Sequence, residues 1–191
     1  MIKGTYKPKF QKVYDILHNQ IKSDYELGAA VSVELNGEEV INLWGGYTSE
    51  SKEKFWEENT IVNVWSVTKA VTGVCIAKLI SDEKLDINQK VSFYWPEYGV
   101  NGKENTKVID FLSHRAGMFG FQEGYPDANW NDWTIYTDAL QSQKPFREPG
   151  STQGYHAVTF AWLVGELIKR VDGRTVGNYF KDEFAKPLNL D

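Results

Sequence analysis

Apolar residues near the start of the chain recur at the spacing of an amphipathic helix, and they predict one over about residues 8–22. These residues are Phe10, Val13, Tyr14, Ile16 and Leu17. From residue 31 to residue 35 apolar and polar positions alternate, which is the period of a strand. Asn36-Gly37 then supplies a tight turn, and residues 40–44 run back as a second strand. The chain is therefore predicted to begin with a helix and a β-hairpin.

The pattern after the hairpin is mainly helical. Residues 48–60 are polar and charged, and they predict a surface connection. Apolar stripes then predict helices at about 66–81, 106–114, 132–142 and 157–171. Residues 117–133 predict an aromatic-rich loop, and loops of this length are typically functional or disordered.

The predicted elements do not complete a fold. Two strands cannot form an independent, well-covered sheet, and no returning strand is predicted before the end of the chain. We therefore expect residues 1–191 to be an incomplete α+β domain whose C-terminal strands are absent. Its parts are a helix and hairpin at 1–47, a connection at 48–65 and a mainly helical region at 66–191.

Composition narrows the class of protein. The chain has 191 residues, of which 41% are hydrophobic and 25% charged, and this is typical of a globular protein with its own core. A net charge of −5 provides no basic footprint, so nucleic acid and membrane surfaces are not expected as partners. The single Cys75 excludes an intramolecular disulfide and fits a reducing compartment. Together with the lack of a signal-peptide pattern, it predicts a cytoplasmic protein.

Several familiar site motifs are absent from the sequence. It contains no G-x-S-x-G, no H-E-x-x-H, no Walker loop and no G-x-G-x-x-G. His18, His114 and His156 lie far apart, without a cysteine or second histidine at ligand spacing. We therefore expect neither a metal nor a cofactor.

The remaining candidate for chemistry is the pattern S-x-x-K. It occurs at Ser49/Lys52, Ser51/Lys54, Ser66/Lys69 and Ser81/Lys84. Only Ser66 follows an apolar segment and opens a helix that is expected to bury its next turns. The other three pairs lie in charged or helix-end surroundings, which predict solvated surface.

Ser66 and Lys69 have a spacing that suits nucleophilic catalysis. Three residues along a helix correspond to about 300° of rotation and roughly 4.5 Å of rise, so both side chains lie on one face. A lysine can activate a serine hydroxyl when its surroundings favour the neutral amine, and a helix N-terminus favours a developing oxyanion. The alternative is that Ser66 is an N-cap and Lys69 a surface residue.

A second candidate group is the phenol of Tyr155. The turn-rich run PGSTQGY, residues 149–155, places this tyrosine just before a long predicted helix. A phenol close to Ser66 and to a protonated Lys69 can ionise, act as a general base and then return the proton as an acid. The alternative is a tyrosine that packs at the start of a helix.

Four segments together resemble the serine β-lactamase-like superfamily. They are WSVTKAVTG at 65–73, KLDINQKVSFYWPEYG at 84–99, VIDFLSHRAGM at 108–118 and PGSTQGYHAVTFAWLVGELIKRVDGRTVGNYF at 149–180. Within the superfamily the chain is most similar to the class C-like branch and the family VIII carboxylesterases, from about residue 27 to its end. The resemblance implies a multi-layer, penicillin-binding-protein-like fold.

The resemblance also implies roles for particular residues. Ser66 would be the acylated nucleophile, Lys69 its activating partner and Tyr155 the second base or acid. The segment after His114 would border the active-site cleft, with Phe121 and Gln122 as lining residues. No metal or cofactor is implied.

Two departures from the family pattern limit what carries over. Penicillin-recognising members usually have Tyr-x-Asn, whereas residues 155–157 here are Tyr-His-Ala, which favours ester or other acyl substrates over β-lactams. The family also has a Lys-Thr-Gly-like strand that supplies the second oxyanion donor, and the 191 residues contain no such motif. Losing one such donor typically costs about 10²–10³ in rate, so we expect these residues alone to be inactive.

These observations lead to a functional hypothesis. The parent protein is expected to be a serine hydrolase, esterase-like, that cleaves a small-molecule ester or amide through an acyl-serine intermediate. Its expected partner is the missing C-terminal half of the same fold. Alternatives within the same chemistry are a β-lactamase, a D,D-peptidase or an acyl transferase. An alternative from another class is a non-catalytic binding protein that retains the fold.

Overall fold

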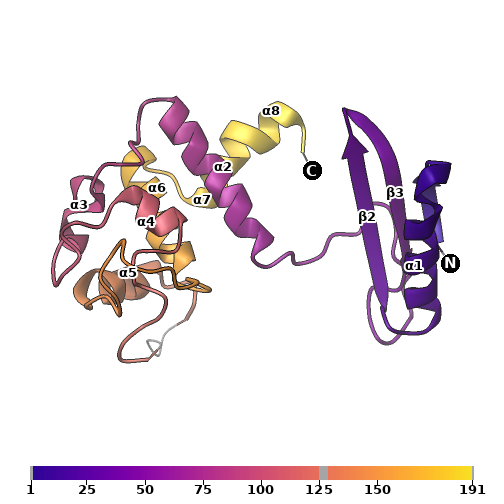
Figure 1. The fold of residues 1–191 in the computed structure, drawn as a ribbon, viewed down its shortest axis with the longest axis horizontal. Coiled ribbons are helices and arrows are strands. Elements are labelled where there is room, and N and C mark those ends of the chain that lie inside the picture. Colours follow the sequence, from indigo (N-terminus) through magenta and orange to yellow (C-terminus); the bar gives the residue numbers. More distant parts are fainter. Residues whose placement is uncertain (1, 125–128, 191) are drawn as a thin grey trace. The chain divides into compact units, whose positions relative to one another are not determined.

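The computed structural model describes residues 2–124 and 129–190 (Figure 1). Residues 125–128 of the expected aromatic-rich loop, among them Tyr125 and Pro126, lie outside the described residues. The chain divides into two units, Met1–Asn63 and Val64–Asp191. Each unit has its own core and is described separately below.

Unit 1 is a three-stranded antiparallel sheet with one helix. Its elements are β1 (Ile2–Tyr6), the 3-10 turn η1 (Pro8–Phe10), α1 (Gln11–Lys22), β2 (Gly28–Leu35) and β3 (Glu38–Gly46). The strand order is β1-β3-β2, so β3 is central and pairs with both neighbours. The predicted first helix and hairpin are confirmed, and both strands are longer than the alternating pattern indicated.

The strand β1 was not predicted from the sequence. Gly4 interrupts its apolar pattern and adopts a left-handed φ of 102°. A Cβ at this position would lie 1.9 Å from the main-chain oxygen of Asn42 on β3, so only glycine allows this approach of the two backbones. A strand that depends on such a close approach lacks the regular alternation by which strands are recognised.

The core of unit 1 lies between α1 and the sheet. Leu17 of α1 is buried together with Val40, Ile41 and Leu43 of β3. Apolar residues of β1 and of the first turns of α1 pack around this cluster. The amphipathic face of α1 therefore covers one face of the sheet, as the helical spacing of its apolar residues requires.

The regular elements of unit 2 are all helical, and its described part contains no strand. Its principal helices are α2 (Val67–Ser81), α4 (Val108–Leu112), α5 (Trp133–Ser142) and α6 (Phe160–Asp172). These four confirm the helices predicted from the sequence. The short elements are α3 (Val91–Tyr94), the 3-10 turn η2 (Pro96–Tyr98), α7 (Val176–Phe180), the π-helical turn η3 (Lys181–Ala185) and α8 (Lys186–Leu188).

The helix α6 lies at the centre of the core of unit 2. All but one of the residues from Phe160 to Ile168 are buried, the exception being Ala161. Around α6 pack Ile76 and Leu79 of α2, and Tyr136 and Leu140 of α5. Gly173 ends the helix in a left-handed conformation, as its place beyond the last apolar residue predicted.

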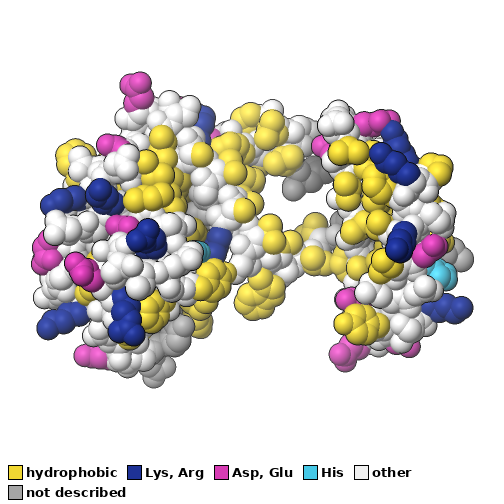
Figure 2. Space-filling view, in the orientation of Figure 1, with side chains coloured by type: hydrophobic (Ala, Val, Ile, Leu, Met, Phe, Trp, Pro, Cys, Tyr) yellow, Lys and Arg dark blue, Asp and Glu magenta, His cyan; other side chains and the backbone are white. Residues whose placement is uncertain are grey.

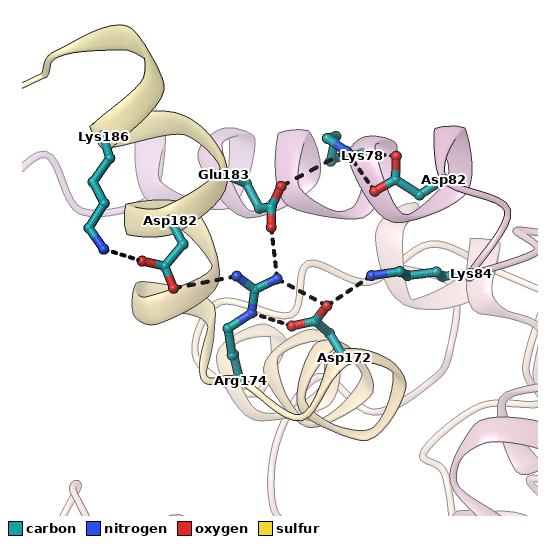
Figure 3. Close-up of polar contacts among 8 residues, drawn as sticks. All are labelled: Lys78, Asp82, Lys84, Asp172, Arg174, Asp182, Glu183 and Lys186. Carbon is teal, nitrogen blue, oxygen red and sulfur yellow. Dashed lines mark hydrogen bonds and ion pairs between the residues drawn. The ribbon is translucent and has the colours of Figure 1, made fainter.

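A network of ion pairs joins the C-terminal end of α2 to the segment that follows α6 (Figure 3). Arg174 is the centre of the network and contacts Asp172, Asp182 and Glu183. Lys84, just beyond α2, also reaches Asp172 at 3.3 Å. Isolated surface pairs contribute little to stability, but a network whose members share partners holds these elements in one geometry.

Apolar side chains are also exposed on both units (Figure 2). On α2, Val67 and Val74 are 61% and 48% exposed, although the opposite side of the helix is buried in the core. A helix that is apolar on all sides is typical of a position inside a larger core. None of the described helices is both long and apolar enough to cross a membrane.

The central position of α6 predicts the effect of truncating one of its side chains. Leu167 is fully buried, so Leu167→Ala is expected to lower the free energy of unfolding by about 2–5 kcal/mol. Lys169 is exposed on the same helix, and Lys169→Ala should change the free energy of unfolding by no more than about 0.5 kcal/mol. Urea denaturation followed by circular dichroism measures both, and equal effects would contradict this account of the core.

Candidate active site

Ser66 lies at the N-terminus of α2, immediately after an unusual backbone conformation. Trp65 has a positive φ of 48°, and Ser66 returns to the right-handed region with φ −71° and ψ −6°. Within the described residues, the Ser66 side chain accepts no capping hydrogen bond from α2. Its exposed hydroxyl contacts other side chains instead, so the N-cap alternative does not describe its hydrogen bonds.

Lys69 lies one helical turn after Ser66 and faces it. Its Nζ donates to Ser66 Oγ at 3.1 Å and to the main-chain oxygen of Ala157 at 2.7 Å. The ammonium also lies 5.1 Å from the ring centre of Tyr155 and 5.6 Å from that of Phe160. These contacts restrain a flexible side chain in one direction, towards the serine.

Tyr155 completes the cluster from a distant part of the chain. Its hydroxyl donates to Ser66 Oγ at 2.8 Å, although the two residues are 89 positions apart. The hydrogen bond with Ser66 and the contact with Lys69 lower the pKa of the phenol from its usual range. Both effects stabilise the phenolate, because Ser66 can then donate to it and Lys69 offsets its charge.

The loop that carries Tyr155 is held against the segment 114–118. Gly154 N–H donates to the main-chain oxygen of His114 at 2.9 Å, and Phe146 N–H donates to that of Gly117 at 2.8 Å. The hydroxyl of Thr159 donates to the main-chain oxygen of Met118 at 2.6 Å. Two loops that are far apart in sequence are thus paired by main-chain hydrogen bonds, and this pairing places the phenol at the start of α2.

The structure thus brings Ser66, Lys69 and Tyr155 together, and it adds groups that the sequence did not indicate. The Ala157 carbonyl holds Lys69, but a main-chain oxygen has no residue signature that a motif search could find. His114 and His156 are in contact with each other, although they lie 42 positions apart in the sequence. Their proximity arises only from the loop pairing.

The two residues expected to line the cleft lie in different surroundings. Phe121 is buried in the core, where its ring contacts those of Tyr136 and Trp162. Gln122 is exposed, and its side-chain amide donates to the main-chain oxygen of Lys144 at 3.0 Å. Their role in binding substrate stays a prediction.

Phe119, in the same segment, packs against Gly154, the residue before Tyr155. Its ring stacks on that of Phe146, with the ring centres 4.8 Å apart. A Cβ at Gly154 would lie 2.8 Å from the Phe119 ring, so this glycine permits close contact. The half-exposed Phe119 gives the Tyr155 loop an apolar neighbour.

The described residues contain no group of three or more His, Cys, Asp or Glu side chains arranged to hold a metal ion. The cluster itself carries a hydroxyl, an amine and a phenol, which can transfer protons and form an acyl bond. The chemistry offered by the cluster is therefore nucleophilic.

The charge of Lys69 predicts the behaviour of Tyr155. In Lys69→Met the phenolate loses its neighbouring cation, so the pKa of Tyr155 should rise towards the usual value of a tyrosine. Lys78→Met is a matched control, because Lys78 lies on the same helix and pairs with Asp82. Titration by NMR with ¹³C-labelled tyrosine measures the pKa, with Tyr155→Phe identifying the signal. An unchanged pKa in Lys69→Met would contradict the electrostatic account.

Comparison with known proteins identifies the family of the chain. The Beta-lactamase family model matches residues 16–191. Among curated proteins, the chain is 30% identical to Esterase/beta-lactamase LipL of Mycobacterium tuberculosis over 188 residues. That match covers 98% of this chain and 43% of LipL, so the chain spans less than half the length of this relative.

Two solved structures share the fold at higher identity. A family VIII carboxylesterase has a TM-score of 0.90 and 35% identity, covering 98% of this chain and 51% of that one. A penicillin-binding protein homologue from Caulobacter crescentus has a TM-score of 0.94 and 34% identity, covering 100% and 52%. These matches confirm the predicted fold class, represented here by a part about half the length of the solved chains. The chain therefore belongs to the beta-lactamase family.

Proposed function

We propose that Ser66 is the acylated nucleophile of a serine hydrolase that cleaves carboxylic esters or amides. The observation that carries this proposal is the convergence of two proton-transfer groups on one hydroxyl. Ser66 Oγ lies 3.1 Å from Lys69 Nζ and 2.8 Å from the Tyr155 hydroxyl. Both distances are within the range over which a general base can take a proton.

The geometry supports Tyr155 as the base in the first step. In the ionised state, the Tyr155 phenolate takes the proton of Ser66 while Oγ forms a bond to the carbonyl carbon of the substrate. The carbonyl electrons move to oxygen, close to the N-terminus of α2, where the helix dipole and main-chain N–H groups favour negative charge. Lys69, held by the Ala157 carbonyl, stabilises the phenolate before the transfer.

The same groups support the later steps. As the tetrahedral intermediate collapses, the bond to the leaving group breaks and Tyr155 returns the proton to it. A water molecule then gives a proton to the Tyr155 phenolate and attacks the acyl-Ser66 carbonyl. As this second intermediate collapses, the bond between Ser66 Oγ and the acyl carbon breaks, Tyr155 returns the proton to Oγ, and the acid is released. No cofactor is required, because every proton moves between substrate, water and side chains.

An ester is the favoured substrate for two reasons. Residue 157 is alanine, so the side-chain amide of the Tyr-x-Asn pattern is missing at this position. Phe119, stacked on Phe146 and packed against Gly154 of the Tyr155 loop, provides an apolar surface that suits an apolar acyl or aryl group. The esterase relatives favour the same choice.

A second candidate function is β-lactam or peptide hydrolysis through the same acyl-serine. Its support is the likeness to a penicillin-binding protein homologue and to a protein named as both esterase and β-lactamase. Acyl transfer to an alcohol is the same chemistry with a different acceptor. A non-catalytic binding protein is less well supported, because the serine, lysine and tyrosine are all present and in contact.

Covalent labelling tests the nucleophile. A fluorophosphonate probe should modify the whole gene product and fail to modify Ser66→Ala. Ser81→Ala is the matched control, because Ser81 begins another S-x-x-K sequence on the same helix and should not affect labelling. Equal labelling of the wild type and Ser66→Ala would overturn the assignment.

Substrate preference separates the two candidate functions. With purified whole gene product, kcat/KM for a short-chain p-nitrophenyl ester should exceed that for nitrocefin. Ser66→Ala, measured in parallel, gives the background for each substrate. A preference for nitrocefin would favour the β-lactamase alternative.

The activity of the isolated chain is a separate prediction. The family resemblance implies a second oxyanion donor on a Lys-Thr-Gly-like strand, and loss of one such donor costs about 10²–10³ in rate. We therefore expect the 191 residues alone to be inactive and a gene product that includes that strand to be active. Esterase assays on both proteins at equal concentration test this, and equal rates would refute it.

A further inference from the structure

We propose that His114 is a positioning residue that fixes the Tyr155 loop, and that it does so only while its Nδ1 is free of a proton. This inference rests on the proposed function, because positioning is useful only if Tyr155 transfers the proton of Ser66. It assigns to His114 a role in catalysis through Tyr155, without contact with the substrate.

The first argument is that His114 holds the chain on both sides of Tyr155. Its main-chain oxygen accepts the N–H of Gly154 at 2.9 Å. Its Nδ1 accepts the N–H of His156 at 3.2 Å. His114 thus accepts the N–H groups of the residues on either side of Tyr155, and its left-handed φ of 59° is part of that arrangement.

The second argument is direct contact between the rings. The imidazole of His114 meets the Tyr155 ring edge to face, with centroids 4.9 Å apart and an interplanar angle of 65°. Phe160, the first residue of α6, packs on the same imidazole at 5.3 Å. The phenol therefore rests on a ring that is itself supported by the core.

His156 supports this arrangement from the buried side. Its Nε2 accepts the N–H of Met118 at 3.1 Å, so its Nδ1 carries the hydrogen and donates to the Gly154 carbonyl at 2.7 Å. Burial lowers the pKa of His156 to about 4 and keeps this ring neutral. The two hydrogen bonds of the His156 ring therefore fix the residue whose main-chain N–H donates to His114 Nδ1.

The protonation state of His114 decides whether the arrangement holds. A proton on Nδ1 would point at the N–H of His156 and remove the acceptor. The titratable groups that face this ring are Lys69 of α2, Tyr155 and His156, and the facing residue of α6 is the non-titrating Phe160. Burial, and then the charge of Lys69, lower the pKa of His114 and favour the neutral ring.

The sign of the pH effect follows from these contacts. Because the pKa of His114 is depressed, the ring is neutral above that pKa, and the Tyr155 loop is then held. As the pH falls through the pKa, the ring gains a proton, the hydrogen bond to His156 is lost and activity should decline. A residue at position 114 whose acceptor does not titrate should therefore remove this decline from the acid side of the pH–activity profile.

Two substitutions separate the acceptor from the ring. His114→Asn places an amide oxygen near the site of Nδ1 and tolerates a left-handed backbone. His114→Phe keeps a ring against Tyr155 but has no acceptor. We expect His114→Phe to lower kcat by about tenfold or more with little change in KM, because it impairs general-base catalysis.

His114→Asn should restore most of the kcat that His114→Phe loses, and its pH–kcat profile should lack the His114 inflection. Equal kcat in His114→Phe and the wild type would overturn the proposal, as would a His114→Asn variant no more active than His114→Phe. Thermal melting by circular dichroism identifies a loss that arises from unfolding.

A measurement independent of activity distinguishes this proposal from the proposed function. In ¹⁵N NMR of the labelled imidazoles, His114 Nδ1 should give the signal of an unprotonated nitrogen that accepts a hydrogen bond at neutral pH. A protonated Nδ1 would overturn the positioning role whatever the enzyme does. Unchanged ester hydrolysis in Ser66→Ala would overturn the proposed function and leave the NMR result to decide the placement of His114.

Discussion

The packing of α2 against α6 is the interaction on which the candidate site depends. Cys75, Ile76 and Leu79 bring one side of α2 into a core centred on α6. The N-terminus of α2 carries Ser66 and Lys69, and the loop before α6 carries Tyr155. A shift between the two helices would separate hydroxyl groups that now lie 2.8 Å apart. At the opposite end of α2, Lys78 pairs with Glu183 and Lys84 pairs with Asp172, and both carboxylates also contact Arg174 (Figure 3).

The sequence predicted the parts of this arrangement that have a local signature. Helical periodicity located α2 and α6, alternation and Asn36-Gly37 located the hairpin, and the S-x-x-K spacing placed Lys69 over Ser66. The strand β1 has no such signature, because it depends on Gly4 and on pairing with β3. The Ala157 carbonyl and the two histidines were missed because loop pairing, a contact between distant segments, brings them to the site.

The chain supplies a candidate nucleophile with candidate proton-transfer partners, and it also has surfaces of the kind found inside larger folds. Val67 and Val74 of α2 are exposed, although the opposite side of the helix is buried in the core of unit 2. In unit 1, β2 pairs with β3 and forms an edge of the described sheet. Relatives about twice as long contain more of the family fold, which agrees with these unsatisfied surfaces. We therefore propose that the cluster of Ser66, Lys69 and Tyr155 is one part of a larger site in the family fold.

Trapping the acyl-enzyme tests the central claim most directly. The whole gene product is mixed with p-nitrophenyl butyrate, quenched in acid during turnover, digested with trypsin and analysed by mass spectrometry. The account predicts a butyryl group on Ser66, within the peptide that spans residues 55–69. Turnover with the acyl group on another residue, or with no acyl-enzyme and no dependence on Ser66, would contradict it.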